Sequence, residues 1–75
     1  MQQAAKFGET NTSGFRLFVS MKQSGYTINS LAKETSITKQ TIRRLLRNDR
    51  IGNLYTWGIL AETLGVSIDW LYRGE

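Results

Sequence analysis

Apolar residues recur every three or four positions along five stretches of this chain, and glycine or small polar residues separate the stretches. This spacing is typical of amphipathic helices that bury one face against a common core. The pattern therefore predicts an all-α fold. The expected helices span about residues 13–24, 28–35, 39–47, 54–64 and 68–72.

Small polar residues stand where these helices should begin, and glycines stand where two of them should end. A side-chain oxygen just before a helix accepts a hydrogen bond from an early backbone N–H group, and glycine readily takes the left-handed backbone that closes a helix. The expected N-caps are one of Asn11, Thr12 or Ser13, followed by Thr27, Thr38, Asn53 and Ser67, and the expected C-caps are Gly25 and Gly65.

The helical period also divides each stretch into an inward and an outward face. In the first stretch the expected core side chains are Phe15, Leu17, Phe18, Val19 and Met21, and the expected outward side chains are Arg16, Lys22 and Gln23. In the fourth stretch the expected core side chains are Leu54, Trp57, Leu60, Ala61 and Leu64. Together the faces suffice for one small core, so we expect a single domain at residues 13–75 after a flexible arm at residues 1–12.

The composition argues against an enzyme. The chain has 75 residues and contains neither cysteine nor histidine, which removes disulfides, thiolate metal ligands, the commonest general base and the usual zinc ligand. Its six carboxylates are not paired at a spacing that suggests two acids acting on one substrate. Because so small a core also leaves little room for an active-site pocket, we expect no catalytic residue, no cofactor and no metal.

The chain also shows no signal for a membrane or for secretion. No apolar run approaches the roughly 20 residues that span a bilayer, and the N-terminal segment lacks the apolar centre of a secretory signal. We therefore expect a soluble cytoplasmic protein.

The positive charge is concentrated in one short segment. Between Thr38 and Arg50 there are five basic residues and one acid, so this segment carries 5 − 1 = +4, and the five basic and five acidic residues elsewhere cancel. A field confined to so few residues suggests a polyanion as partner. An ordinary solvated basic helix face is the alternative reading of the same charges.

The third predicted helix has two contrasting faces. Ile42, Leu45 and Leu46 should point into the core, and the opposite side carries Lys39, Gln40, Arg43, Arg44 and Arg47. A buried anchor combined with an exposed basic and polar strip is what a helix needs in order to read the major groove of DNA. Glutamine can pair with adenine there, and arginine or lysine can pair with guanine.

Several elements of the chain occur in a characteristic order. Leu31 and Ala32 lie in the second helix, a turn ends in Ile37, Thr38 precedes the third helix, and the segment AETLGVSIDWL closes the domain at residues 61–71. From Tyr26 to Leu71 this order resembles the lambda-repressor-like and Cro family of helix-turn-helix DNA-binding domains. The resemblance implies a compact five-helix domain that commonly binds operator DNA as a dimer.

The resemblance also implies which residues face the DNA. The third helix would bring Thr38, Lys39, Gln40, Arg43 and Arg44 to base edges or nearby phosphates, with Arg47 reaching the backbone. The implied phosphate contacts elsewhere are Thr27, Asn29, Asn48, Arg50 and Asn53. Candidates for an apolar dimer surface near the last two helices are Tyr55, Ile59, Trp70 and Tyr72. Packing of Trp70 on its own domain is an equal alternative.

Two residues depart from the family pattern. The turn often holds glycine where this chain has Ser36, so either this serine adopts a left-handed backbone, at a cost of about 1 kcal/mol, or the turn differs. The second helix often begins with a DNA-contacting glutamine, whereas this chain has Ile28.

The preferred interpretation is a transcriptional regulator that binds double-stranded DNA, most simply a homodimeric repressor on an inverted-repeat operator. The alternative is a protein-interaction module of antitoxin or scaffold type that uses the same fold without reading DNA. A basic helix on an anionic membrane and an RNA-binding domain are weaker alternatives, because four other helices can bury Ile42, Leu45 and Leu46 and no aromatic residue interrupts the basic segment. The ending WLYRGE suits either a complete small regulator or the DNA-binding part of a longer repressor.

Overall fold

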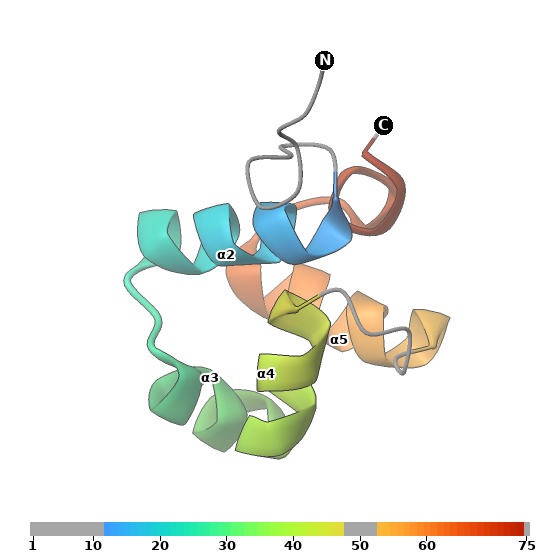
Figure 1. The fold of residues 1–75 in the computed structure, drawn as a ribbon. Helices are drawn as coiled ribbons and strands as arrows, with labels where there is room; N and C mark the ends of the chain where they lie inside the picture. The colour runs from blue at the N-terminus through green and yellow to red at the C-terminus, as the bar shows by residue number, and fades with distance from the viewer. Residues whose placement is uncertain (1–11, 48–52, 75) are drawn as a thin grey trace.

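The computed structural model describes residues 12–47 and 53–74, and these residues form five helical elements with no strand among them (Figure 1). The elements are α2 (Ser13–Ser24), α3 (Ile28–Thr35), α4 (Lys39–Leu46), α5 (Leu54–Leu64) and η1 (Asp69–Arg73). The prediction of an all-α fold with five helices is confirmed.

The helices α3 and α4 lie together at one end of the domain, joined by a tight turn (Figure 1). Helix α2 packs against α4, and α5 packs against both α2 and α3. The element η1 closes the opposite end of the domain, where it packs against α2 and α5. The other described elements therefore pack on one side of the α3–α4 pair, and none of them packs against its outer side.

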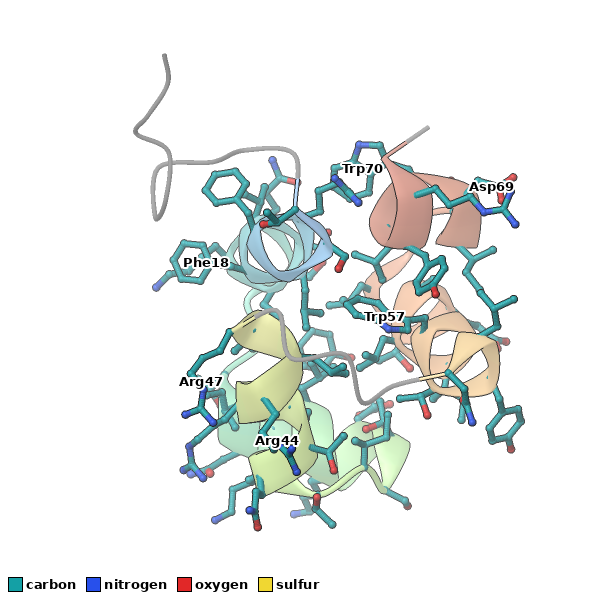
Figure 2. The ribbon with its side chains drawn as sticks, turned by 45° about the vertical axis from the view of Figure 1, so that its right-hand side comes forward. Phe18, Arg44, Arg47, Trp57, Asp69 and Trp70 are labelled. Carbon is teal, nitrogen blue, oxygen red and sulfur yellow. The ribbon has the colours of Figure 1, made fainter. Side chains whose placement is uncertain are left out.

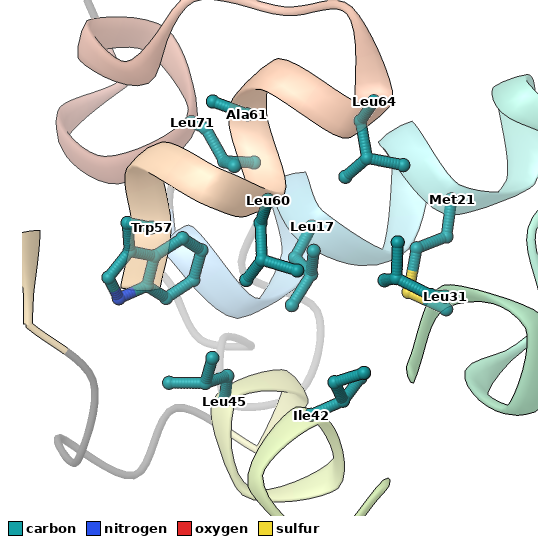
Figure 3. Packing of buried hydrophobic residues seen from close by; sticks show 10 residues of the cluster. All are labelled: Leu17, Met21, Leu31, Ile42, Leu45, Trp57, Leu60, Ala61, Leu64 and Leu71. Carbon is teal, nitrogen blue, oxygen red and sulfur yellow. The ribbon is translucent and has the colours of Figure 1, made fainter. Parts of the chain in front are cut away.

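One hydrophobic cluster joins all five elements (Figure 3). Its buried members are Leu17, Met21, Leu31, Ile42, Leu45, Trp57, Leu60, Ala61, Leu64 and Leu71. Leu17 of α2 and Leu60 of α5 lie near its centre in Figure 3, and every one of the five elements contributes at least one buried side chain, so each is fixed by the burial of its own apolar face.

Side-chain caps begin four of the helices where the sequence predicts them. The hydroxyls of Thr12, Thr27 and Thr38 each accept a hydrogen bond from the backbone N–H three residues later, at 3.1, 3.0 and 3.1 Å. The side-chain oxygen of Asn53 does the same for α5, at 2.9 Å. Such caps are worth about 1 kcal/mol each, because they satisfy N–H groups that have no partner inside the helix.

The C-terminal boundaries differ slightly from the prediction. Helix α4 ends at Leu46, and Arg47 is the residue that caps it. The last element covers Asp69–Arg73 and is a π-type turn, wider than an α-helix. The hydroxyl of Ser67 still accepts from the N–H of Trp70 at 3.1 Å, so the predicted cap is present ahead of this turn.

The buried face of α2 is rotated from the predicted one. Phe18 was expected in the core, but 48% of its surface is exposed, and its ring lies beside Phe15 and under the Lys22 ammonium (Figure 2). Arg16 was expected to face outward and is buried. The small residues Gly14 and Ser20 take the inward positions beside Leu17, because α4 and η1 pack closely against this side of α2.

A similar correction applies at the start of α5. Leu54 was expected to point inward, yet 51% of its surface is exposed. The first turn of α5 extends past the core, and Trp57 is the first side chain of this helix to be fully covered.

Arg16 is buried because its guanidinium group donates hydrogen bonds to backbone carbonyls of η1. Its Nε donates to the carbonyl of Leu71 and its Nη2 to the carbonyl of Tyr72, both at 3.1 Å. Carbonyls in the last turn of a helix lack partners inside the helix, so a charged donor is favourable there. The approach is tight: a Cβ at Gly74 would lie only 2.9 Å from Arg16 Nη1. Burial lowers the pKa of this arginine, which nevertheless stays protonated at neutral pH.

Replacing Arg16 with methionine should lower the free energy of unfolding by about 2–3 kcal/mol, because two carbonyls lose a charged donor and the aliphatic stem is kept. Urea unfolding followed by tryptophan fluorescence measures this loss. The matched control is Arg73→Met, which changes an exposed arginine on η1 and should shift stability by less than about 0.5 kcal/mol. Equal losses in the two variants would show that Arg16 does not lock η1.

Candidate nucleic-acid interface

Helix α4 presents opposite chemistry on its two sides. Ile42 and Leu45 are buried on the inner side. The outer side carries Lys39, Gln40, Arg43, Arg44 and Arg47, which we call the α4 strip. At about 100° per residue these five positions fall within an arc of roughly 140°, centred opposite the buried pair. The predicted strip is therefore formed by the observed helix.

The exposure of the strip matches an interface rather than a core. Lys39, Gln40, Arg43 and Arg47 are exposed, and Arg44 is half-buried. Figure 2 shows Arg44 and Arg47 on the outer side of α4, away from Trp57 in the interior. Residues 38–47 include four basic residues and no acid, so the outer side of this helix carries four positive charges.

The turn between α3 and α4 contains a left-handed residue although it has no glycine. Ser36 adopts the left-handed backbone, with φ of 64°, and its N–H donates to the carbonyl of Ala32 at 2.8 Å. The hydroxyl of Thr35 accepts from the N–H of Ile37 at 3.2 Å and donates to the carbonyl of Leu31 at 2.8 Å. Ile37 packs against the core, so the turn sets the angle between α3 and α4.

Replacing Ser36 with glycine should raise the free energy of unfolding by about 0.5 kcal/mol, since glycine removes the cost of the left-handed backbone but loses more conformational freedom on folding. Gly25 provides the reciprocal test. It has φ of 77° and nothing within 4 Å of an added Cβ, so Gly25→Ser should destabilise through the backbone alone. Thermal unfolding gives the change in melting temperature for both variants. Changes of the same sign would contradict this explanation of the turn.

The hydroxyls of Thr27 and Thr38 are already engaged in capping. Thr38 Oγ1 accepts from the N–H of Thr41 and donates to the Thr41 hydroxyl at 2.9 Å. Thr27 and Ser30 form a reciprocal capping box, in which the Ser30 hydroxyl accepts from the N–H of Thr27 at 2.9 Å. The parts played by Ser30 and Thr41 were not predicted, although a hydroxyl three residues after a threonine cap is a recognisable signal.

Of the other predicted DNA-contact residues, the structure describes Asn29 and Asn53. Asn29 is exposed at the N-terminal end of α3, almost two turns before the α3–α4 corner. Asn53 is exposed as well, but its side-chain oxygen caps α5. Asn48 and Arg50 lie outside the described residues.

The four candidates for a dimer surface fall into two groups. Tyr55 and Ile59 stand four residues apart on one face of α5, and Tyr55 is 77% exposed. The Tyr72 ring packs against the buried Trp57 ring, with centroids 5.9 Å apart. Trp70 is half-buried against the core and lies between η1 and α2 in Figure 2. Trp70 therefore packs partly on its own domain, and its part in a dimer surface stays a prediction.

Two short helices joined by a tight turn, with an exposed basic strip on the second, define a helix-turn-helix domain. The family model described as Helix-turn-helix (HTH_3) matches residues 20–71, more than half of the chain. The chain belongs to this lambda-repressor and Cro-like helix-turn-helix family, which is a family of DNA-binding regulators and not of enzymes.

No curated protein and no solved structure shows a significant match to the chain. Within residues 12–47 and 53–74, none of the helices is both long enough and apolar enough to cross a membrane.

Proposed function

We propose that this protein is a sequence-specific transcriptional repressor that binds an inverted-repeat operator as a homodimer. The observation that carries the proposal is the α4 strip: four basic side chains and one amide on the open side of a helix whose other side is anchored by Ile42 and Leu45. Membership of a family of DNA-binding regulators supports the same conclusion.

In the proposed complex, α4 lies in the major groove and α3 crosses the DNA backbone. The N-terminal part of the second helix of this motif contacts base edges. Lys39, Gln40 and Arg43 therefore read bases, while Arg44 and Arg47, nearer the C-terminal end, neutralise phosphates. The N-terminal end of α3, which Thr27 caps, carries a partial positive charge and lies against the DNA backbone in this arrangement. Asn29 and the predicted residues Asn48 and Arg50 add phosphate contacts.

Occupancy of the promoter is enough for repression, so no chemical step is required of the protein. Phosphate contacts supply most of the affinity and make it depend on salt, and base contacts select the site. Each good base contact discriminates by about 1–3 kcal/mol. A domain bound across the promoter excludes polymerase from the same DNA.

A second copy is needed because α4 alone reads too little sequence. Eight residues at about 1.5 Å per residue give a helix roughly 12 Å long, which spans only three or four base pairs. We place the dimer contact on α5, where Tyr55 and Ile59 form one apolar face beside the exposed Leu54. Tyrosine is favoured at such contacts because it buries a large rigid ring.

Replacing Tyr55 with glutamate should abolish cooperative binding to a full operator, because the new charge would be buried between the two copies. We expect at least a tenfold loss of affinity for the inverted repeat and no change for a single half-site. Electrophoretic mobility shifts on both duplexes measure the difference. The control is Phe18→Glu, a similar change at an exposed aromatic residue of α2. Unaltered cooperativity in Tyr55→Glu would rule out this dimer contact.

The proposed function is tested by selecting bound duplexes from a random pool at near-physiological salt and sequencing them. The expected result is an inverted repeat whose half-sites are about one helical turn apart. Binding without an enriched motif would mean association through phosphates alone, and no binding would favour the protein-interaction alternative.

A further inference from the structure

The side chains of the α4 strip are almost entirely hydrogen-bond donors. Arginine and lysine side chains can only donate, and in this strip only the Gln40 amide also carries an acceptor oxygen. Lys39, Gln40 and Arg43 are exposed and make no side-chain hydrogen bond to any described residue. Their donors therefore point to solvent and are available to a ligand.

The acceptors near the strip are few and partly occupied. The Thr38 hydroxyl donates to the Thr41 hydroxyl and accepts from the N–H of Thr41, so part of the hydrogen-bonding capacity of both threonines is used within the helix. The described part of the segment between Ser36 and Arg47 contains no aspartate or glutamate. The N-terminal half of α4 consequently lacks a carboxylate that accepts from the cytosine amino group.

The base pairs differ in what they offer to such donors. In the major groove guanine presents two acceptors, N7 and O6, whereas adenine presents one acceptor and one donor. Cytosine offers a donor, and thymine offers one acceptor beside a methyl group. A cationic side chain that can only donate therefore fits guanine best, and the amide of glutamine, which donates and accepts, fits adenine.

We propose that each operator half-site contains two guanines, read by Lys39 and Arg43, together with an adenine read by Gln40. This inference rests on the proposed function and adds the base composition of its target. Lys39 and Arg43 are four residues apart, or about 6 Å along the helix axis. That distance is close to two base-pair steps of about 3.4 Å, so the two guanines lie no more than about two base pairs apart.

The first test uses the motif selected by the wild-type protein. Arg43→Gln should bind a duplex in which one guanine of each half-site is replaced by adenine better than it binds the wild-type motif. The wild-type protein should show the reverse preference, by about tenfold or more. A matched control is Arg47→Gln, which makes the same substitution at the phosphate end of the strip and should weaken binding to both duplexes equally.

The second test removes a single acceptor from the DNA. Placing 7-deazaguanine at the guanine assigned to Arg43 should weaken wild-type binding several-fold and leave Arg43→Ala unaffected, because that variant has already lost the donor. Equal weakening of both proteins would overturn the assignment of this guanine to Arg43.

The outcomes separate the two proposals. An enriched inverted repeat without guanine in its half-sites would overturn the guanine assignment and leave the repressor proposal standing. If the motif contains guanines but neither Lys39→Ala nor Arg43→Gln changes the preference for guanine, the assignment of these two residues as its readers is overturned. Failure to enrich any motif would overturn both proposals together.

Discussion

Replacing Arg43 with alanine should lower the affinity for the selected operator by about thirtyfold or more. The side chain is exposed in the middle of the α4 strip, and each copy of a dimer would lose one bidentate contact to guanine worth about 1–3 kcal/mol. Two such losses per operator multiply, because each 1.4 kcal/mol is a factor of ten in affinity. Fluorescence anisotropy with the labelled operator at fixed salt measures the change.

The control for this variant is Lys22→Ala, which removes a positive charge from α2. Lys22 lies near the end of α2 and its ammonium rests 5.8 Å from the centre of the Phe18 ring. Loss of this charge should change operator affinity by less than about threefold, since screening weakens its attraction to distant phosphates. Equal losses of operator affinity in the two variants would show that the α4 strip is not the binding face.

The second large effect concerns the core. Leu60→Ala should lower the free energy of unfolding by about 3 kcal/mol, because a fully buried leucine leaves a cavity that the surrounding helices fill only in part. A domain of this size has roughly 5 kcal/mol of stability in total. The variant should therefore melt at least about 12 °C lower than the wild-type protein.

Leu54→Ala is the matched control, since it makes the same change in the same helix. Leu54 is 51% exposed and Leu60 is 0% exposed. We expect a loss of less than about 1 kcal/mol for Leu54→Ala, and circular dichroism melting of both variants gives the comparison. A small loss at Leu60 would mean that α5 can shift to fill the space.

Helix boundaries were predictable because they are local. Thr27, Thr38 and Asn53 cap helices through hydrogen bonds to residues three positions away, and such signals are written in short stretches of sequence. The α4 strip was predictable for the same reason, since a period of 3.6 residues separates Ile42 and Leu45 from the basic side chains.

The buried face of α2 was not predictable in this way. Helical spacing groups residues into faces, but it does not say which of two apolar faces meets the core. Arg16 is buried because it reaches the carbonyls of Leu71 and Tyr72, which lie 55 and 56 residues further along the chain. No local pattern encodes that contact, and Phe18 is left on the outer side as a result.

The proposed dimer surface could be narrowed only with the fold, for a related reason. Tyr55, Ile59, Trp70 and Tyr72 are all apolar and close in sequence, so composition alone treats them alike. The structure separates them through contacts: Tyr72 lies against Trp57 and Trp70 against the core, which leaves Tyr55 as the most exposed. Burial of an aromatic ring is decided by its neighbours in space.

The division of α4 into two faces has a consequence for how such proteins diversify. Lys39, Gln40 and Arg43 are exposed, whereas Ile42 and Leu45 hold the helix to the core. Because these two sets of positions do not overlap, a substitution at the three proposed base-reading positions should leave the free energy of unfolding almost unchanged. If these positions select the DNA site as proposed, a lineage carrying this helix could acquire a new target through single substitutions while every intermediate stays folded, and randomising the three positions would sample the same paths in the laboratory.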